Sequence, residues 1–182
     1  YTAFTSREPH GVVAGIIPWN YPLQILARVA GAALAMGNTL VIKPAEDASL
    51  TSLRIADLAL EAGCPAGVFN VVTGYGGEAG AALSAHPGVD YVTFTGSTGT
   101  GTAIQQAAAL NNRGVTMELG GKSPQILFAD ADLDAALPVV VNAIIQNGGQ
   151  TCSAGSRLLV EKPIHDEVMA ALARSFSALV AE

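Results

Sequence analysis

Short apolar runs rich in β-branched residues alternate along the chain with longer runs whose apolar positions recur every three or four residues. The first pattern predicts strands, and the second predicts amphipathic helices. We expect strands at Gly11–Ile17, Thr39–Lys43, Val68–Thr73, Tyr91–Thr95, Val115–Glu118, Ser123–Phe128 and Arg157–Val160. We expect helices at Leu23–Met36, Ser49–Ala62, Gly77–Ala85, Thr100–Leu110, Leu133–Gln146 and His165–Ala181.

The order of these elements predicts the fold class. Strands that alternate with helices at this spacing form parallel βαβ units with right-handed crossovers. We therefore expect an α/β protein in which the first five strands form an open, doubly wound parallel sheet of the Rossmann-like kind. Gly120 and Gly121 follow the fifth strand and indicate a domain boundary. This boundary separates residues 1–120 from the start of a second α/β domain at residues 121–182.

The composition fits a folded protein and excludes two classes of partner. Half of the 182 residues are apolar and 5% are aromatic, which suits helices packed closely on a sheet. The formal net charge is −6 and the chain has no block of Lys or Arg, so we expect no nucleic-acid partner. The most apolar stretch, Leu23–Met36, contains Arg28 and is shorter than the ~20 residues of a membrane span, so we expect no membrane segment.

The two cysteines, Cys64 and Cys152, lie far apart in the sequence and form neither a disulfide framework nor a CxxC metal pair. We therefore expect a reducing, cytoplasmic compartment and no bound metal. The sequence begins with Tyr1 rather than Met, and it ends within the last expected helix. We interpret the chain as an internal segment of a longer protein and expect it to be inactive alone.

Glycine-rich or polar residues follow several expected strands, where open parallel sheets bind their ligands. The turn Gly96–Gly101 leads from a strand into a helix, and a turn of this kind can present backbone N–H groups to a phosphate. The turn Gly74–Gly76 has the same context, so the glycine pattern alone does not choose between them. Both turns are also compatible with ordinary chain reversal, which favours glycine.

Three further side chains are suited to catalysis. Cys152 lies in a small, polar loop, where its thiolate could be a nucleophile or its thiol could be a spare loop residue. Glu118 ends the fifth strand, where a buried carboxylate could be a general base and a solvated one would be ordinary. Asn20 lies between Pro18 and Pro22, which restrict the loop, so its amide could be a fixed oxyanion donor or a turn former.

Five segments together resemble the aldehyde dehydrogenase superfamily in composition, order and spacing, across about residues 11 to 160. They are Pro18-Trp19-Asn20-Tyr21-Pro22, Lys43-Pro44-Ala45-Glu46, Phe94-Thr95-Gly96-Ser97-Thr98, Glu118-Leu119-Gly120-Gly121-Lys122 and Gly149-Gln150-Thr151-Cys152.

This resemblance implies the oxidation of an aldehyde to a carboxylic acid by covalent catalysis. Cys152 would attack the aldehyde, and the Asn20 amide with the Cys152 backbone N–H would hold the oxyanion. Hydride transfer to NAD(P)⁺ would leave a thioester, and Glu118 would activate the water that hydrolyses it.

The resemblance also implies that residues 1–120 form most of an NAD-binding domain and that residues 121–182 begin a truncated catalytic domain. Lys43 and Glu46 would face the adenosine ribose. Because the Glu46 carboxylate would accept from a 2′-hydroxyl and repel a 2′-phosphate, we expect NAD, with NADP possible because of Lys43. The complete set of implied cofactor contacts is Ile17, Pro18, Trp19, Lys43, Glu46, Gly96, Ser97 and Gly120.

Members of this superfamily have longer chains and form dimers or tetramers, so we expect a homodimer or homotetramer of the full-length protein. Two other interpretations stay open at this point. In a cysteine hydrolase or CoA-dependent acyl transferase, Cys152 would still be the nucleophile, but the acyl group of its thioester would go to a different acceptor. A nucleotide-binding protein would use the same fold without catalysis. The sequence does not identify the aldehyde.

Overall fold

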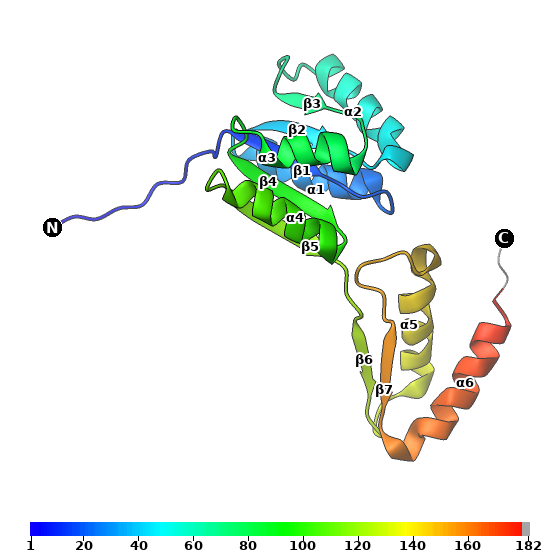
Figure 1. Cartoon of the computed structure of the whole chain (residues 1–182). Coiled ribbons are helices and arrows are strands. Elements are labelled where there is room, and N and C mark those ends of the chain that lie inside the picture. The colour runs from blue at the N-terminus through cyan, green and yellow to red at the C-terminus, as the bar shows by residue number, and fades with distance from the viewer. Residues whose placement is uncertain (180–182) are drawn as a thin grey trace. The chain divides into compact units, whose positions relative to one another are not determined.

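The computed structural model describes residues 1–179. The last helix was expected to reach Ala181, which lies outside these residues, but it already ends at Ser177. The chain divides into two compact units, an N-terminal unit, Tyr1–Leu119, and a C-terminal unit that begins at Gly120 (Figure 1). Within residues 1–179, no helix is long and apolar enough to cross a membrane.

The N-terminal unit is built on an open sheet of five parallel strands in the order β3-β2-β1-β4-β5 (Figure 1). Both β2 and β4 pair with β1, so the strand order reverses beside β1. The doubly wound α/β fold expected from the sequence is therefore confirmed. The strands are β1 (Val12–Ile16), β2 (Thr39–Lys43), β3 (Phe69–Val71), β4 (Tyr91–Gly96) and β5 (Gly114–Leu119). The helices are α1 (Pro22–Ala35), α2 (Ser49–Glu61), α3 (Ala81–Ala85) and α4 (Thr98–Ala109).

Alternating side chains of the strands form separate cores on the two faces of this sheet. Val13 of β1 packs in a core with α1 and α2, which includes Leu40 of β2. Ala14 and Ile16 point to the other face and pack in a core with α3 and α4, which includes Phe94 of β4. Strands buried on both faces read as nearly continuous apolar runs, which explains why the sequence pattern located them well.

Several element ends differ from the sequence expectation for local reasons. α1 begins at Pro22 rather than Leu23, because proline is tolerated in the first helical turn, where its missing N–H costs nothing. α4 begins at Thr98 rather than Thr100. The expected helix Gly77–Ala85 is a π-helical turn at Gly76–Gly80 followed by the short α3.

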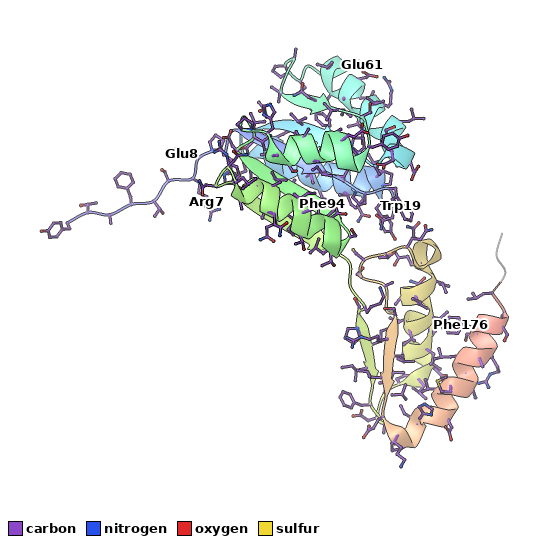
Figure 2. All side chains as sticks on the ribbon, viewed as in Figure 1. Arg7, Glu8, Trp19, Glu61, Phe94 and Phe176 are labelled. Carbon is purple, nitrogen blue, oxygen red and sulfur yellow. The ribbon has the colours of Figure 1, made fainter. Side chains whose placement is uncertain are left out.

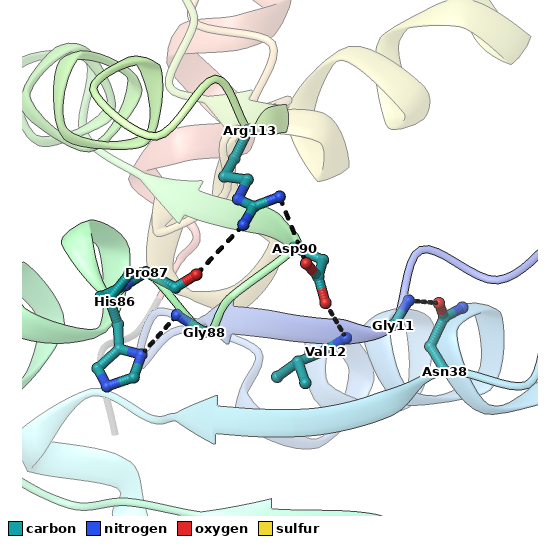
Figure 3. Close-up of polar contacts among 8 residues, drawn as sticks. All are labelled: Gly11, Val12, Asn38, His86, Pro87, Gly88, Asp90 and Arg113. Carbon is teal, nitrogen blue, oxygen red and sulfur yellow. Dashed lines mark hydrogen bonds and ion pairs between the residues drawn. The ribbon is translucent and has the colours of Figure 1, made fainter.

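At the amino ends of the strands, Asp90 connects three parts of the sheet edge (Figure 3). Its carboxylate Oδ2 accepts a hydrogen bond from the Val12 N–H at 2.9 Å, and its own N–H donates to the Val12 carbonyl, also at 2.9 Å. Arg113 lies 3.4 Å from Asp90 Oδ1 and donates to the Pro87 carbonyl at 3.2 Å. These bonds hold the starts of β1, β4 and β5 together.

Gly11 and Asn38 close the same edge beside β2 (Figure 3). The Gly11 N–H donates to Asn38 Oδ1, and Asn38 Nδ2 donates to the Ala33 carbonyl, both at 3.0 Å. Gly11 has φ +117°, and a Cβ there would collide with the Asp90 carboxylate. Glycine is therefore required at this position both by the backbone conformation and by the close approach of Asp90.

The C-terminal unit has two parallel strands, which are joined by a helical crossover and covered by a second helix. Its small core contains Leu127, Val140, Val168 and Leu172. Its elements are β6 (Pro124–Leu127), α5 (Leu133–Ile145), β7 (Arg157–Val160) and α6 (His165–Ser177). This unit is α/β, as the sequence pattern predicts.

Candidate active site

The sheet of the N-terminal unit brings four of the expected segments to one edge. Ile16 at the end of β1 pairs with Lys43 of β2 and with Phe94 of β4. Gly96 of β4 in turn pairs with Leu119 of β5. The segments that follow β1, β2, β4 and β5 therefore lie at one carboxyl edge. This edge includes the point where the strand order reverses, which is where open α/β sheets bind ligands.

Lys43 and Glu46 form an ion pair at this edge. The Lys43 side chain is only 3% exposed, and its Nζ donates to Glu46 Oε2 at 3.1 Å. The pKa of Glu46 lies below its ordinary value, first because its own backbone N–H binds the carboxylate and then because Lys43 adds a hydrogen bond and a positive charge. The Glu46 side chain is 45% exposed. The pair thus offers an ammonium donor and an ionised, accessible acceptor side by side.

Ser97 begins α4 after the end of β4. Its Oγ accepts a hydrogen bond from the Thr100 N–H at 3.3 Å, as expected of an N-cap. The first turn of α4 is exposed and contains no acidic residue. Because the first N–H groups of a helix lack intrahelical acceptors, this end can receive an anion. The competing turn at Gly74–Gly76 leads into the π-helical turn and the five-residue α3, so it offers a poorer helix N-terminus.

The four expected site residues after β1 differ in burial. Ile17 is buried, and its N–H donates to the Lys43 carbonyl at 3.0 Å, which extends the pairing of β1 with β2. Pro18 and Asn20 are half-buried. The Trp19 side chain is exposed at this edge, and Figure 2 shows it away from Arg7 and Glu8. Asn20 therefore lies in a short segment that is fixed on both sides, by the end of β1 and by the start of α1.

Glu118 does not lie in the buried environment that the sequence analysis considered for a general base. Its side chain is 43% exposed, and its Oε1 accepts a hydrogen bond from Arg28 Nη2 of α1 at 2.6 Å. The pair borders a cavity of about 480 Å³ whose lining also includes Thr95 and Thr116. In the sequence, Arg28 is only a charge within an apolar stretch. Its contact with Glu118 could not be predicted, because the partners are 90 positions apart and meet only when α1 packs on the sheet.

Cys152 lies in the C-terminal unit, in a loop between α5 and β7, and it is exposed. The backbone has left-handed conformations just before it, since Asn147, Gly148 and Gly149 have φ values of 52°, 63° and 77°. Cys64, by contrast, is partly buried and packs against the core beneath α1 and α2. Of the two thiols, that of Cys152 is the better placed to meet a substrate.

The side chain of Gln125, on β6, anchors the residues that follow Cys152. Its Nε2 donates to the Gly155 carbonyl at 3.1 Å and to the Val140 carbonyl of α5 at 3.3 Å. The Gly155 N–H donates to the Ala143 carbonyl of α5 at 3.0 Å. These bonds connect the loop to α5, so that Cys152 is exposed on a backbone that is held in place.

The groups in the N-terminal unit suit a nicotinamide dinucleotide. The Lys43–Glu46 pair can donate to and accept from ribose hydroxyls, and the start of α4 can receive a pyrophosphate. Gly120, which is exposed, and Cys152 belong to the C-terminal unit. Within residues 1–179, no group of three or more His, Cys, Asp or Glu side chains could hold a metal ion.

Known proteins resemble this chain along almost its whole length. A hydroxyisobutyraldehyde dehydrogenase of Mycolicibacterium austroafricanum is 56% identical over 167 residues, which are 92% of this chain and 33% of that protein. The solved structure of an NAD-dependent aldehyde dehydrogenase from Sinorhizobium meliloti is 51% identical, with a TM-score of 0.89, over 92% of this chain and 33% of that one. A betaine aldehyde dehydrogenase from Staphylococcus aureus, solved in complex with NAD⁺, is 44% identical, with a TM-score of 0.92, over 94% of this chain and 34% of that one.

The chain thus spans about a third of the length of the relatives that it matches. The sequence model of the aldehyde dehydrogenase family matches residues 1–182, the whole of the chain. The chain belongs to the aldehyde dehydrogenase family.

Proposed function

We propose that the full-length protein oxidises an aldehyde to a carboxylic acid through a thioester on Cys152, with NAD as the hydride acceptor. The observation that carries this proposal is the carboxyl edge of the sheet, where Asn20, the Lys43–Glu46 pair, Ser97 and Glu118 follow neighbouring strands. The N-terminal unit would then be most of the NAD-binding domain, assigned to residues 1–120. Residues 121–182 would begin the catalytic domain and carry the nucleophile.

The cofactor would bind along this carboxyl edge. Glu46 would accept a hydrogen bond from the adenosine ribose, and Lys43 would donate to the same sugar. Ser97 and the exposed first turn of α4 would face the pyrophosphate. The remaining proposed contacts, which come from the family resemblance, are Ile17, Pro18, Trp19, Gly96 and Gly120. The NAD⁺ bound to the betaine aldehyde dehydrogenase supports this choice of cofactor.

In the first half of the reaction, the thiolate of Cys152 adds to the carbonyl carbon of the aldehyde. A C–S bond forms, and the carbonyl oxygen becomes an oxyanion. The Asn20 side-chain amide and the Cys152 backbone N–H would donate to this oxyanion as it develops. Bound NAD⁺ supplies the acceptor for the hydride that leaves the same carbon. A thioester on Cys152 is then the product of this half-reaction.

In the second half of the reaction, Glu118 would accept a proton from water as the water oxygen adds to the thioester carbon. The C–S bond then breaks, the Cys152 thiolate leaves, and the carboxylic acid is released. An exposed Glu118 carboxylate is accessible to water, which favours hydrolysis over acyl transfer to CoA. NADH formation followed with and without CoA separates these two outcomes.

The partners and compartment follow from the same assignment. We infer a small-molecule aldehyde as the substrate and a homodimer or homotetramer as the assembly of the full-length protein. Two free cysteines, with no disulfide between them, are compatible with a reducing, cytoplasmic compartment. The acidic net charge and the lack of Lys/Arg blocks support neither a nucleic-acid nor a membrane partner.

The nucleophile can be tested with the two cysteines of this chain. In the full-length protein, Cys152→Ala should abolish aldehyde-dependent NADH formation and leave the Kd for NAD⁺ nearly unchanged, because only the reacting sulfur is removed. Cys64→Ala is the matched control, since Cys64 packs against the core, and it should keep turnover within a few-fold of the parent. Substantial turnover in Cys152→Ala would show that the nucleophile is another group.

A further inference from the structure

The ion pair between Arg28 and Glu118 joins α1 to β5 across 90 positions of sequence. Its 2.6 Å contact is shorter than those of the Lys43–Glu46 and Arg54–Glu61 pairs, at 3.1 and 2.9 Å, and a guanidinium–carboxylate contact of this length is a charge-assisted hydrogen bond. Both side chains are substantially exposed, and an exposed pair contributes little to stability. What distinguishes this pair from other exposed pairs is its place, at the end of β5 and beside a cavity.

We propose that Arg28 is a positioning residue for Glu118, an inference that rests on the proposed role of Glu118 as the base that activates water. Arg28 Nη2 binds Oε1 and leaves Oε2 as the oxygen that accepts the proton of water. A glutamate side chain has three rotatable bonds, so a free carboxylate at the end of β5 would sample many directions. Anchoring one oxygen restricts those directions, and correct orientation is a large part of the effect of a general base.

The surroundings of the pair support a role at a site rather than on a general surface. Arg28 and Glu118 border the same cavity of about 480 Å³, whose lining extends along α1 and the sheet from Asn38 and Tyr91 near the amino edge to Thr95 at the carboxyl edge. The helix side of the cavity supplies Arg28, and the strand side supplies Glu118, so the contact spans the cavity wall. A carboxylate fixed there faces a space that water and a small molecule can enter.

A second ion pair provides a matched control. Arg54 donates to Glu61 within α2 at 2.9 Å, and those side chains are 58% and 61% exposed. The two pairs thus have the same chemistry and similar exposure. Neither Arg54 nor Glu61 lies at the carboxyl edge or borders the cavity. Replacing Arg54 removes an equivalent surface pair without touching the proposed base.

The test is rapid mixing of the full-length protein with NAD⁺ and an aldehyde, which separates the burst of NADH from the steady-state rate. Arg28→Met should lower the steady-state rate about 10-fold, because hydrolysis of the thioester would then limit turnover. The rate of the NADH burst and the Kd for NAD⁺ should stay unchanged. Arg28→Lys should recover part of the lost rate, because an ammonium can still bind Oε1. Arg54→Met should leave both phases unchanged.

The double variant distinguishes positioning from a structural effect. In a Glu118→Gln background, Arg28→Met should cause no further slowing, because the group that it positions is already gone. Equal slowing of burst and steady state by Arg28→Met, additive slowing in the double variant, or no slowing at all would overturn the inference. If Glu118→Gln alone left the steady-state rate intact, the proposed base would be wrong, whatever Arg28 does.

Discussion

The carboxylates at the two edges of the five-stranded sheet have different binding partners. At the amino edge, the Asp90 carboxylate is bound by the Val12 N–H and by Arg113, so its acceptors are used by the protein itself. At the carboxyl edge, Glu46 and Glu118 each contact a single cation and stay nearly half exposed. The Asp90 side chain is also 34% exposed, so the edges differ mainly in what the carboxylates bind: Asp90 binds the backbone of a neighbouring strand, and Glu46 and Glu118 each pair with a cationic side chain. The first arrangement stabilises the sheet, and the second is available to a ligand.

This difference predicts that substitutions at the carboxyl edge change rates and that substitutions at the amino edge change stability. The largest effect is expected for Glu118→Gln, which keeps the shape of the side chain but cannot accept a proton from water. Loss of a general base costs typically 10²–10⁴-fold in rate, so the steady-state rate should fall by roughly 10² or more. The burst of NADH should remain, and the melting temperature should change little.

Rapid-mixing kinetics of the full-length protein measures the burst and the steady-state rate, and thermal unfolding measures the melting temperature. Glu61→Gln, on the exposed surface of α2, is the control and should leave both quantities unchanged. Loss of the burst together with the steady state would mean that Glu118 also helps to deprotonate Cys152. A large fall in melting temperature would mean that the carboxyl edge is not distinct from the amino edge.

At the amino edge, Asp90→Ala should weaken the sheet with little effect on kcat. It leaves the part-buried Val12 N–H without its side-chain acceptor, which costs up to about 1–3 kcal/mol to the extent that water does not replace the acceptor. Backbone amides of β1 and β4 should then exchange with deuterium roughly 5- to 150-fold faster. Hydrogen-exchange mass spectrometry measures this, with Asp57→Ala on the exposed face of α2 as the control. A kinetic defect without faster exchange would contradict the assignment of this edge to stability.

A smaller effect is expected for cofactor choice. Glu46→Ser removes a carboxylate that would accept from a ribose 2′-hydroxyl and repel a 2′-phosphate, so the ratio of kcat/KM for NAD to that for NADP should fall about 10-fold. Because Lys43 stays, its ammonium becomes available to the phosphate. Steady-state kinetics with both cofactors, with Glu61→Ser as the control, gives the ratio. A parent enzyme that prefers NADP would show that Glu46 does not face the ribose.

The central strands β1, β2 and β4 could be predicted from the sequence because they are largely buried on both faces, and β7 was located although Arg157 and Leu159 are exposed. The residues Thr39–Lys43 and Arg157–Val160 form strands with the expected bounds. The ends of helices were less predictable where local sequence is ambiguous. The run Gly76–Gly80 has little helix propensity, and it forms a π-helical turn that no apolar periodicity indicates.

The candidate site was predictable only as far as it depends on strand ends. Lys43, Gly96 and Glu118 follow or end parallel strands, so the topology alone brings them to one edge. The contact of Arg28 with Glu118 depends instead on the rotation of α1 about its axis and on a side-chain rotamer. Neither quantity is encoded in spacing or composition. The half-exposed environment of Glu118 follows from the same packing and could not be predicted from its position in the sequence.

The central claim is that Cys152 carries the acyl group and that Glu118 acts after it. The most direct test uses full-length Glu118→Gln mixed with NAD⁺ and aldehyde, quenched in acid within the slow phase and digested with trypsin. Residues 123–157 form one tryptic peptide, and Cys152 is its single cysteine. This peptide should gain the mass of the acyl group only when both NAD⁺ and aldehyde are present, and the peptide that carries Cys64 should not. A slow steady state with an unmodified 123–157 peptide, or an acyl group on another residue, would contradict the account.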